Sequence, residues 1–417
     1  MNFKTGYKQT EIGVIPEDWK VLQLGEIGKF SKGSGIKKDD SQSGEIACVR
    51  YGEIYTKHNH VVKNYHSFIS QGVAKGAKKL KTGDILFAGS GETKEEIGKS
   101  VAVVDDIDVY AGGDIVVFSP LNTDSVFLGY LLDTPLARLQ KSSKGQGDAV
   151  VHISSSSLST IKLPFPPLPE QTAIAAALSD VDALMGELDK LIAKKRDIKQ
   201  ATMQQLLTGK KRLAGFSGEW EENKLEKFAS FYKGKGLAKN EIDIYGKTPC
   251  VHYGELFTQY AESITETHSR INLSGNVFLS KNNDVLMPTS DVTPNGLAKA
   301  SCILKDDIIL GGDILVIRTN PKEINGTFLS FVIRHSKEKI MQLVTGSTVY
   351  HLYASDMKNF IFLIPSIEEQ TAIATILSDM DAEINALQQK RDKTAQLKQG
   401  MMQELLTGRI RLIIVND

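Results

Sequence analysis

Two short stretches of the chain come close to catalytic motifs, and neither completes one. Ile97-Gly98-Lys99-Ser100 resembles the end of a phosphate-binding loop, G-x-x-x-x-G-K-[ST], but Thr93 stands where the first glycine is needed. Asn320-Pro321-Lys322-Glu323 is the nearest approach to the Asn-Pro-Pro-Tyr/Phe motif of an N6-adenine methyltransferase, and it lacks the second proline and the aromatic residue. The histidines show neither HExxH nor paired-cysteine spacing, so no metal site is indicated. The sequence predicts a binding protein that is not an enzyme and binds no cofactor itself.

Two segments rich in glycine and lysine offer a different chemistry. They read GKFSKGSGIKK at 28–38 and YKGKGLAK at 232–239. Lysines neutralise phosphates, and glycines permit close approach of a backbone. Because the segments recur at matching positions, we expect them near DNA; the alternative is a solvated surface loop. Their lysines are Lys29, Lys32, Lys37, Lys38, Lys233, Lys235 and Lys239.

Residues that could hydrogen-bond to base edges lie in segments that differ between the two halves of the chain. Reading bases in the major groove needs side chains such as Asn, Gln, Arg, Ser or Thr. The candidates in the first half are His58, Asn59, His60, Ser90, Thr93, Lys94, Lys144 and Gln146. The candidates in the second half are Gln259, Tyr260, Ser290, Asp291, Thr293, Asn295, Thr345, Ser347 and Tyr350. His152 and His351 match each other, and a role in the scaffold is at least as good an interpretation as contact with DNA.

The chain repeats itself. Residues 170–213 and 369–412 align without a gap at an offset of 199, with 23 identities over 44 positions. Landmarks also recur further upstream: Tyr51-Gly52-Glu53 matches 253–255, and Gly112-Gly113-Asp114 matches 311–313. The repeat is far longer than the roughly 20–50 residues of a solenoid unit. A whole domain plus a long helix is therefore used twice, which suits a target that itself has two halves.

Each repeated segment predicts one long helix that begins after a proline-rich stretch and ends at Thr-Gly. Apolar residues recur at spacings of three and four, which is the a/d seam of a coiled coil. The seam residues are Ile174, Leu178, Val181, Met185, Leu188 and Ile192, and then Ile373, Leu377, Met380, Ile384 and Leu387. Lys195 and Arg391 break the seam, and apolar residues resume at Ile198 and Leu206 and at Leu397 and Leu405. We expect the two helices to pair antiparallel with each other; a core helix or a homodimer coil is the alternative.

The remainder of each half consists mostly of short apolar runs of strand length bounded by Gly, Asn and Pro. Helices are expected at 125–143 and at 326–344, where apolar residues recur every three or four positions. The predicted fold is α+β, with two strand-rich globules, two long helices and a pseudo-two-fold repeat. The expected domains are 1–165, a central helix at 166–212, 213–363, and a C-terminal helix at 364–417.

Bulk composition limits the class of protein. The chain has 417 residues, enough for two or three domains, and its formal net charge is zero, which argues against a non-specific binder of polyanions. Its longest apolar runs are shorter than the ~18 residues that a membrane span needs. The first residues lack the apolar core of a secretory signal, so we expect a cytoplasmic protein. Cys48 and Cys250 occupy matching positions and are expected to be buried, reduced thiols.

Two variable domains, each followed by a repeated helix within a PLPEQ…LLTG frame, resemble the specificity subunit of a type I restriction–modification enzyme. The IPEDW and GFSGEW segments are similar to that family too, and the resemblance covers the whole chain. It implies two target recognition domains that each read one half of a split, asymmetric site in double-stranded DNA. It also implies two methyltransferase subunits docked on the helices and motor/nuclease subunits that complete the enzyme. S-adenosylmethionine, ATP and Mg would be bound by those partners and not by this chain.

Physical reasoning supports the same interpretation. Two different binding domains held apart by a stiff coil should recognise two short sequences at a fixed spacing, and half-sites one helical turn apart lie ~34–36 Å from each other. A change in coil length should therefore change the spacer and leave the half-sites unaltered. The main alternative is a coiled-coil scaffold that displays two protein-binding domains and has no nucleic-acid role. A second is DNA recognition within a different restriction or modification assembly.

Overall fold

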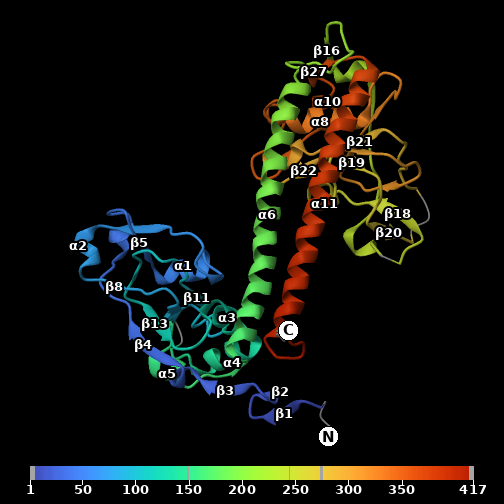
Figure 1. Ribbon diagram of the computed structural model, residues 1–417. Coiled ribbons are helices and arrows are strands. Elements are labelled where there is room, and N and C mark those ends of the chain that lie inside the picture. The colour runs from blue at the N-terminus through green and yellow to red at the C-terminus, as the bar shows by residue number, and fades with distance from the viewer. Residues whose placement is uncertain (1–4, 148–149, 244, 273–275, 413–417) are drawn as a thin grey trace. The chain divides into compact units, whose positions relative to one another are not determined.

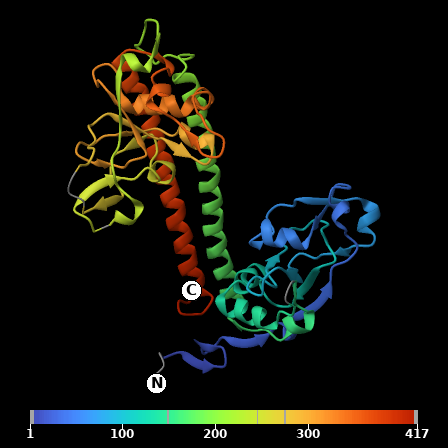
Figure 2. The same ribbon diagram turned by 180° about the vertical axis from the view of Figure 1, so that it is seen from behind.

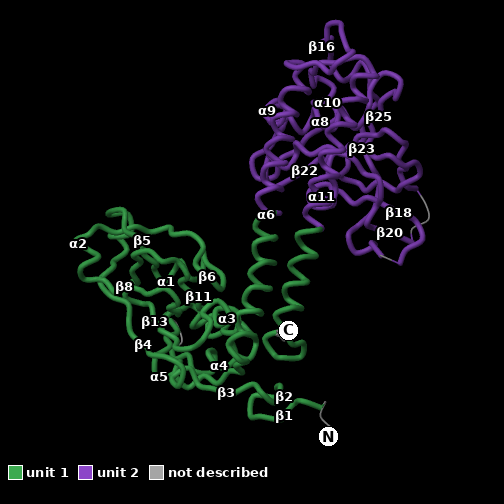
Figure 3. The backbone as a smooth tube through the Cα atoms, viewed as in Figure 1, with its two compact units in different colours: residues 1–187, 390–417 green, residues 188–389 purple. Residues whose placement is uncertain are grey.

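The protein forms two compact units in a computed structural model that describes residues 5–147, 150–243, 245–272 and 276–412. The first unit comprises 1–187 and 390–417, and the second comprises 188–389 (Figures 1 and 3). Each unit contains one strand-rich domain and part of both long helices, α6 (Leu168–Leu206) and α11 (Ile367–Leu405). The α+β class and the duplicated organisation predicted from the sequence are confirmed.

The first unit is built on a five-stranded mixed sheet of order β4-β13-β9-β11-β6, with a four-stranded sheet, β7-β5-β12-β8, beside it. The strands of the two sheets are β4 (Gly28–Lys32), β5 (Ile46–Val49), β6 (His60–Val61), β7 (Ser67–Ile69), β8 (Lys78–Lys79), β9 (Ile85–Ala88), β11 (Ser100–Ala102), β12 (Tyr110–Ala111) and β13 (Ile115–Pro120). Three antiparallel pairs complete the set: β1 (Tyr7–Thr10) with β2 (Gly13–Pro16), β3 (Lys20–Gln23) with β15 (Lys162–Phe165), and β10 (Ser90–Gly91) with β14 (Val151–His152). The short helices are α1 (Tyr51–Thr56), α2 (Gln71–Ala74), α3 (Ser125–Leu131), α4 (Pro135–Lys144) and α5 (Ser155–Ser159).

The second unit repeats this plan. Its five-stranded sheet has the order β17-β25-β21-β23-β19, strand for strand the equivalent of the first, and a three-stranded sheet, β20-β18-β24, accompanies it. The strands are β16 (Glu221–Lys224), β17 (Ala229–Lys233), β18 (Thr248–Val251), β19 (Ser263–Ile264), β20 (Ser269–Ile271), β21 (Asp284–Pro288), β22 (Ser290–Asp291), β23 (Ser301–Ile303), β24 (Ile309–Leu310), β25 (Ile314–Thr319), β26 (Tyr350–His351) and β27 (Ile361–Ile364). The short helices are α7 (Glu255–Thr258), α8 (Gly326–His335), α9 (Lys337–Met341) and α10 (Ala354–Met357).

Both faces of each five-stranded sheet are buried. Along β9, Ile85 and Phe87 join a core that also contains α3, whereas Leu86 and Ala88 join a second core with Val49 of the neighbouring sheet. Successive side chains of a strand point to opposite faces, so a strand covered on both sides must be apolar along its whole length. This explains the continuous apolar runs in the sequence.

The two predicted shorter helices are each interrupted, which corrects the sequence interpretation. The segment 125–143 forms α3 and α4, and 326–344 forms α8 and α9. In the first unit the break follows from local chemistry, because the Thr134 side chain caps the N-terminus of α4 and Pro135 occupies its first turn. Apolar residues keep their spacing of three and four positions across the break, so the sequence pattern does not reveal it.

The long helices pair antiparallel, as predicted, and Figures 1 and 2 show them side by side. In the first unit, Ile174 and Leu178 near the start of α6 share a core with Leu405 and Leu406 at the end of α11. The second unit has the reciprocal arrangement, with Leu206 and Leu207 against the start of α11. Every predicted seam residue is buried or half-buried. By contrast, Ile198 and Leu397, which were expected to continue the seam, are 42% and 60% exposed.

A buried glutamate stands at the start of α11 and ties the second unit together. The Glu369 carboxylate accepts two hydrogen bonds from Arg212, at 2.8 Å from Nε and 2.6 Å from Nη2, and one of 3.1 Å from Trp220 Nε1. Arg212 follows the end of α6, and Trp220 precedes the first strand of the domain. One carboxylate thus joins two helix ends and the domain.

The first unit has the equivalent cluster around Glu170. Arg411 donates to this carboxylate from Nε and Nη2, both at 2.7 Å, and Trp19 Nε1 donates at 3.1 Å. Here Arg411 also makes two hydrogen bonds, of 2.9 and 2.8 Å, to Asp18. The Glu of the repeated Pro-x-x-x-Glu-Gln stretch is therefore a structural residue.

The neighbouring glutamine of the same stretch fixes each domain to its helix. Gln171 accepts a 3.0 Å hydrogen bond from the backbone N–H of Asp124, the residue that caps α3. Gln370 accepts the equivalent 2.9 Å bond from Asn325, which caps α8. Each Glu-Gln pair therefore joins the helix pairing to the seating of a domain.

Replacement of Arg212 tests this arrangement. Arg212→Met leaves the Glu369 carboxylate, whose side chain is 1% exposed, with Trp220 as its remaining side-chain donor. Removing one partner leaves an uncompensated buried carboxylate, so we expect the variant to unfold at a clearly lower urea concentration than the wild-type chain. Urea unfolding followed by circular dichroism measures this difference. The exposed Arg196→Met on α6 is the control, and equal stability of the two variants would contradict the role of the cluster.

Candidate nucleic-acid interface

The first unit has a hollow of about 560 Å³ beside one end of the five-stranded sheet. Its polar lining comes from β4, from β10, from the residue before β13 and from the segment around β14. The lining residues are Ser31, Lys32, Gly89, Ser90, Asp114, Ile115, Val116, Gln146, His152, Ile153, Ser154 and Ser155. Hydroxyl, amide and imidazole groups are the kinds that bond to base edges, and an ammonium group suits a phosphate.

The second unit has a hollow of about 630 Å³ at the equivalent place. The lining positions correspond, but several side chains differ in kind. The lining residues are Phe231, Tyr232, Lys233, Thr289, Ser290, Asp313, Leu315, His351, Leu352, Tyr353, Ala354 and Ser355. Lys, Ser, Asp and His recur in both hollows, whereas Tyr232 and Tyr353 replace Ser31 and Ser154. The two units thus present one frame with different contacts.

Short strand pairs bring together residues that are far apart in sequence. β10 pairs with β14 so that Ser90 lies opposite His152, and Ser90 Oγ is 2.9 Å from His152 Nδ1. β22 pairs with β26 so that Ser290 lies opposite His351. The imidazole of His351 stacks on the ring of Tyr353, with the ring planes 18° apart. A serine and a histidine therefore lie opposite each other at each hollow, and in the first unit their side chains are in contact.

Two glycines of the Gly/Lys segments, Gly33 and Gly234, are required by close backbone packing within the protein. A Cβ added to Gly33 would lie 1.9 Å from the carbonyl oxygen of Gly112, and one added to Gly234 would lie 1.9 Å from that of Gly311. Two backbones pass so closely here that a side chain is excluded. The repeated Gly-Gly-Asp landmark is explained by the same contact, which sets Asp114 and Asp313 beside the lysines.

In the second unit, the aspartate of the Gly-Gly-Asp landmark forms an ion pair with the lysine that lines the hollow. Lys233 Nζ lies 3.5 Å from Asp313 Oδ1, and both side chains are at least half exposed. An exposed ion pair of this kind contributes little to stability, on the order of 0–1 kcal/mol. The lysine is therefore available to exchange its carboxylate partner for a phosphate.

The predicted contact residues divide between the hollows and their surroundings. Lys32, Ser90, Gln146, Lys233 and Ser290 line the hollows. Lys37 and Lys38 line another cavity, of about 780 Å³, together with Arg50 and Tyr51. The remaining candidates on the surface lie outside these linings and are Lys29, Thr93, Lys94, Lys144, Lys235, Lys239, Gln259, Thr293, Asn295, Thr345, Ser347 and Tyr350. Two further candidates of the second half make contacts within the protein. Tyr260 is buried, and Asp291 accepts hydrogen bonds from Val292 N–H and Thr293 Oγ1.

The two predicted histidines of the first half are placed for structural contacts. His58 is 3% exposed, and burial lowers the pKa of its imidazole. His60 Nε2 lies 3.1 Å from Asp133, and Nδ1 lies 3.4 Å from Lys398 of α11, so the ring faces the long helices. The sequence predicts both histidines in a segment that differs between the two halves, and no pattern in it indicates these contacts.

Several lining residues escaped the sequence reasoning, among them Asp114, Asp313 and Tyr353. Asp114 and Asp313 had a usable signal, since both end a Gly-Gly-Asp landmark present in each half. Tyr353, which is 52% exposed, had none because its equivalent in the first half is Ser154. His152 and His351, left open between scaffold and contact, lie on the linings of the hollows.

Each unit also carries an ion pair between the two long helices. Lys398 Nζ lies 2.7 Å from Asp182 in the first unit, and Lys199 Nζ lies 2.6 Å from Asp381 in the second. Each lysine sits over an aromatic ring of its domain, Tyr130 or Phe331 in turn. The domain, α6 and α11 therefore meet at one polar contact in each unit.

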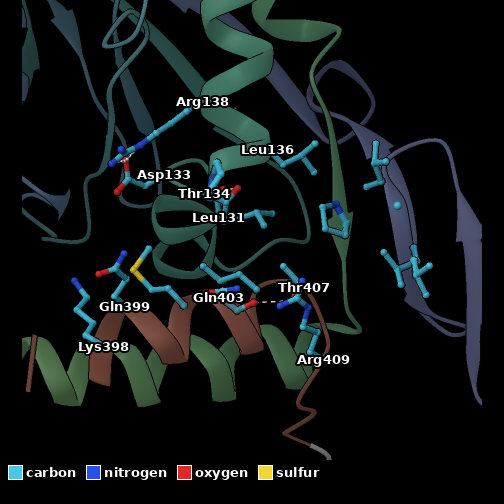
Figure 4. A pocket seen from close by; sticks show the side chains of 18 of the residues that line it. Leu131, Asp133, Thr134, Leu136, Arg138, Lys398, Gln399, Gln403, Thr407 and Arg409 are labelled. Carbon is cyan, nitrogen blue, oxygen red and sulfur yellow. Dashed lines mark hydrogen bonds and ion pairs between the residues drawn. The ribbon is translucent and has the colours of Figure 1, made fainter. Parts of the chain in front are cut away.

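A cleft of about 750 Å³ lies in the first unit between the β1–β2 hairpin, the turn joining α3 and α4, and the last turns of α11. Figure 4 shows Lys398, Gln399 and Gln403 facing this cleft from α11. Opposite them, Asp133 is held by Arg138 through bonds of 3.0 and 2.8 Å. One side of the α11 end is thus left accessible.

The described residues offer no obvious site for a metal ion or a thiol reaction. Within them, no group of three or more His, Cys, Asp and Glu side chains could hold a metal ion. Cys48, Cys250 and Cys302 are buried free thiols, and burial raises their pKa values to about 12, 11 and 12. In the same part of the chain, no helix is both long and apolar enough to cross a membrane.

The sequence matches one family twice. The profile described as "Type I restriction modification DNA specificity domain" matches residues 16–199 and 217–399. Two relatives come from Methanocaldococcus jannaschii: the proposed specificity subunit of the type I restriction enzyme MjaX is 26% identical, and the MjaVIII specificity subunit is 25% identical. The alignments cover 97% of this chain and 97% of the first relative, and 96% and 95% for the second.

Solved structures resemble the whole chain. The crystal structure of a type I restriction–modification S subunit from M. genitalium superimposes with a TM-score of 0.63 at 14% identity, covering 97% of this chain and 98% of that one. A chain from a study of complex assembly and conformational transition in a type I system gives 0.53 at 16% identity, covering 95% and 99%. These likenesses establish the fold.

Proposed function

Since the chain belongs to the family of type I restriction–modification DNA specificity domains and is a specificity subunit of such a system, we propose that its two strand-rich domains each recognise one half of a split, asymmetric DNA site. Specificity subunits are non-catalytic recognition components, so the chain is not itself an enzyme. The proposed target recognition domains are residues 1–165 and 213–363. The helical segments 166–212 and 364–417 are the proposed spacer.

One observation carries the proposal: the same hollow occurs in both units with a common frame and different linings. Lys, Ser, Asp and His recur, whereas Ser31 and Ser154 of the first hollow are replaced by Tyr232 and Tyr353 in the second. Constant lysines suit the phosphates that every sequence shares, and variable side chains suit bases that differ. Two such hollows in one chain fit a target with two unlike halves.

We further propose that two methyltransferase subunits and the motor/nuclease subunits bind this chain in the cytoplasm. S-adenosylmethionine, ATP and Mg would then be held by those partners. The helices supply a surface for docking, because large apolar side chains remain exposed on them. They are Leu184 and Leu397 in the first unit, and Leu191 and Ile198 in the second. The cleft beside the last turns of α11 extends the accessible surface there (Figure 4).

The direct test is methylation mapping. The chain is co-expressed with its cognate adenine methyltransferase, and modified bases are located by single-molecule sequencing. We expect adenine methylation confined to a split site and lost when this chain is omitted. A stable complex with an active methyltransferase but no sequence-specific methylation would contradict the proposal and favour a protein-binding scaffold.

Replacing a lining lysine separates phosphate binding from base reading. Lys32→Ala or Lys233→Ala should weaken DNA binding about equally for all sequences and reduce the slope of log K against log salt by about one. Titrations of the methyltransferase complex at several salt concentrations measure both quantities. The matched contrast is Asn295→Ala, which should relax one position of one half-site and leave the salt slope unchanged. An unchanged slope in both lysine variants would contradict the proposal that these hollows contact DNA.

Charges on the exposed apolar positions should block docking. Leu191→Lys and Ile198→Lys place ammonium groups on a face that is 39–42% exposed, so the isolated fold is expected to tolerate them. Burial of either charge against a methyltransferase would be costly, and we expect at least a tenfold loss of affinity, which is about 1.4 kcal/mol. Pull-down with the methyltransferase measures it. Leu139→Lys, at a position 71% exposed on α4, is the control and should bind normally.

A further inference from the structure

A segment that follows the serine of each hollow leads from the short strand that carries this serine to a strand of the five-stranded sheet. In the first unit it is 92–99, between β10 and β11, and it carries Thr93 and Lys94. In the second unit it is 292–300, between β22 and β23, and it carries Thr293 and Asn295. We name these segments the recognition loops. Their tips are exposed, so whatever orients them must act at their ends.

In the first unit a buried lysine holds the end of the loop. Lys141 of α4 is 3% exposed, and its Nζ donates hydrogen bonds of 2.9 Å to the carbonyl of Gly98 and 3.0 Å to that of Leu132. A lysine is almost never fully buried without a charged partner. Here both recorded acceptors are backbone carbonyls, and the nearby Asp133 carboxylate is bonded to Arg138 and His60. Burial lowers the pKa of Lys141 to about 8.

The geometry of the loop end matches this contact. Gly98 has a φ of +68°, which favours glycine, and an added Cβ would lie 3.2 Å from Cδ of Lys141. The next residue, Lys99, donates a 3.0 Å bond to the carbonyl of Tyr55. The last turn of the loop is therefore fixed by two lysines before the chain enters β11.

The second unit holds its loop with a different residue from a different helix. Arg334, in the last turn of α8, donates from Nε to the carbonyl of Ala300 at 2.7 Å. Its Nη2 donates to the carbonyls of Tyr260 and Ala261, at 3.0 and 2.9 Å, and to Ser301 Oγ at 3.2 Å. At the offset of 199 that relates His152 to His351, the position equivalent to Lys141 is occupied by Ile340, which is buried and apolar. The two units thus hold the end of the recognition loop with unrelated residues.

We propose that Lys141 and Arg334 are positioning residues for DNA recognition, each fixing the recognition loop of its own domain so that the loop presents its side chains to one half-site. The proposal rests on the proposed function of the two domains. A base contact needs a donor or acceptor held to within a fraction of an ångström, and a loop gains that precision from a rigid attachment. A cation with carbonyl acceptors supplies the attachment and leaves the outer loop residues free to vary.

The test compares half-sites within one complex. Lys141→Met and Arg334→Met are each co-expressed with the methyltransferase, and methylated sites are mapped as sequence preferences of the two halves. We expect Lys141→Met to reduce discrimination at the first domain's half-site by about tenfold, the size of one base contact, and to leave the other half-site unchanged. Arg334→Met should do the reverse. Arg334→Lys should restore part of the preference, because it keeps a cation beside Ala300.

Further variants and outcomes keep the proposal testable. If Lys141→Met does not assemble, Gly98→Ala perturbs the same attachment from the loop side and should broaden the same half-site. Unchanged discrimination at both half-sites, with a wild-type complex that methylates a split site, would overturn the positioning role. A uniform loss at both half-sites would also overturn it, because that is the signature of general destabilisation. A wild-type complex without sequence-specific methylation would instead count against the proposed function.

Discussion

A buried carboxylate at the start of each long helix is the contact on which the rest of the structure depends. Glu170 and Glu369 are 5% and 1% exposed, and each is bonded to an arginine that follows the other helix and to a tryptophan that precedes its domain. A buried carboxylate without donors is strongly unfavourable, so the three segments must assemble together. Pairing of the helices and seating of the domain are thereby coupled in each unit.

The two clusters differ where the chain connects them differently. Arg212 lies eight residues before Trp220, so a short segment keeps both near Glu369. Arg411 and Trp19 are separated by almost the whole sequence, and only contacts hold them together. Asp18 adds two hydrogen bonds to Arg411 at this place. In the second unit a short chain segment links the arginine to the tryptophan. In the first unit no such segment exists, and bringing the two residues together closes a much longer loop, which has a larger entropic cost. The additional charge-assisted bonds to Asp18 occur in this unit.

A feature can be predicted from this sequence when residues close together in the chain determine it, and is missed when distant residues do. The antiparallel helices follow from a local apolar period that occurs twice, and the strand content follows from short apolar runs. The hollows do not follow in this way, since Lys32, Ser90 and Gln146 meet only through strand pairing that is non-sequential. His58 illustrates the limit, because a polar residue in a variable segment reads as exposed until the packing around it is known. Repetition of a landmark proved the better guide: Gly112 and Gly311 mark a backbone crossing in both units.

The long helices could slide along a purely apolar seam, because a shift by one heptad would leave a/d residues opposite a/d residues. Reciprocal polar contacts remove that freedom. In the first unit Lys398 meets Asp182, and in the second Lys199 meets Asp381, each with low exposure of both side chains. A shift by seven residues would separate both pairs and would also remove the arginines from their buried glutamates. Ionic contacts that add little net stability can still exclude other registers, and a fixed register is what a coil needs if it is to set the spacing between two recognised sequences.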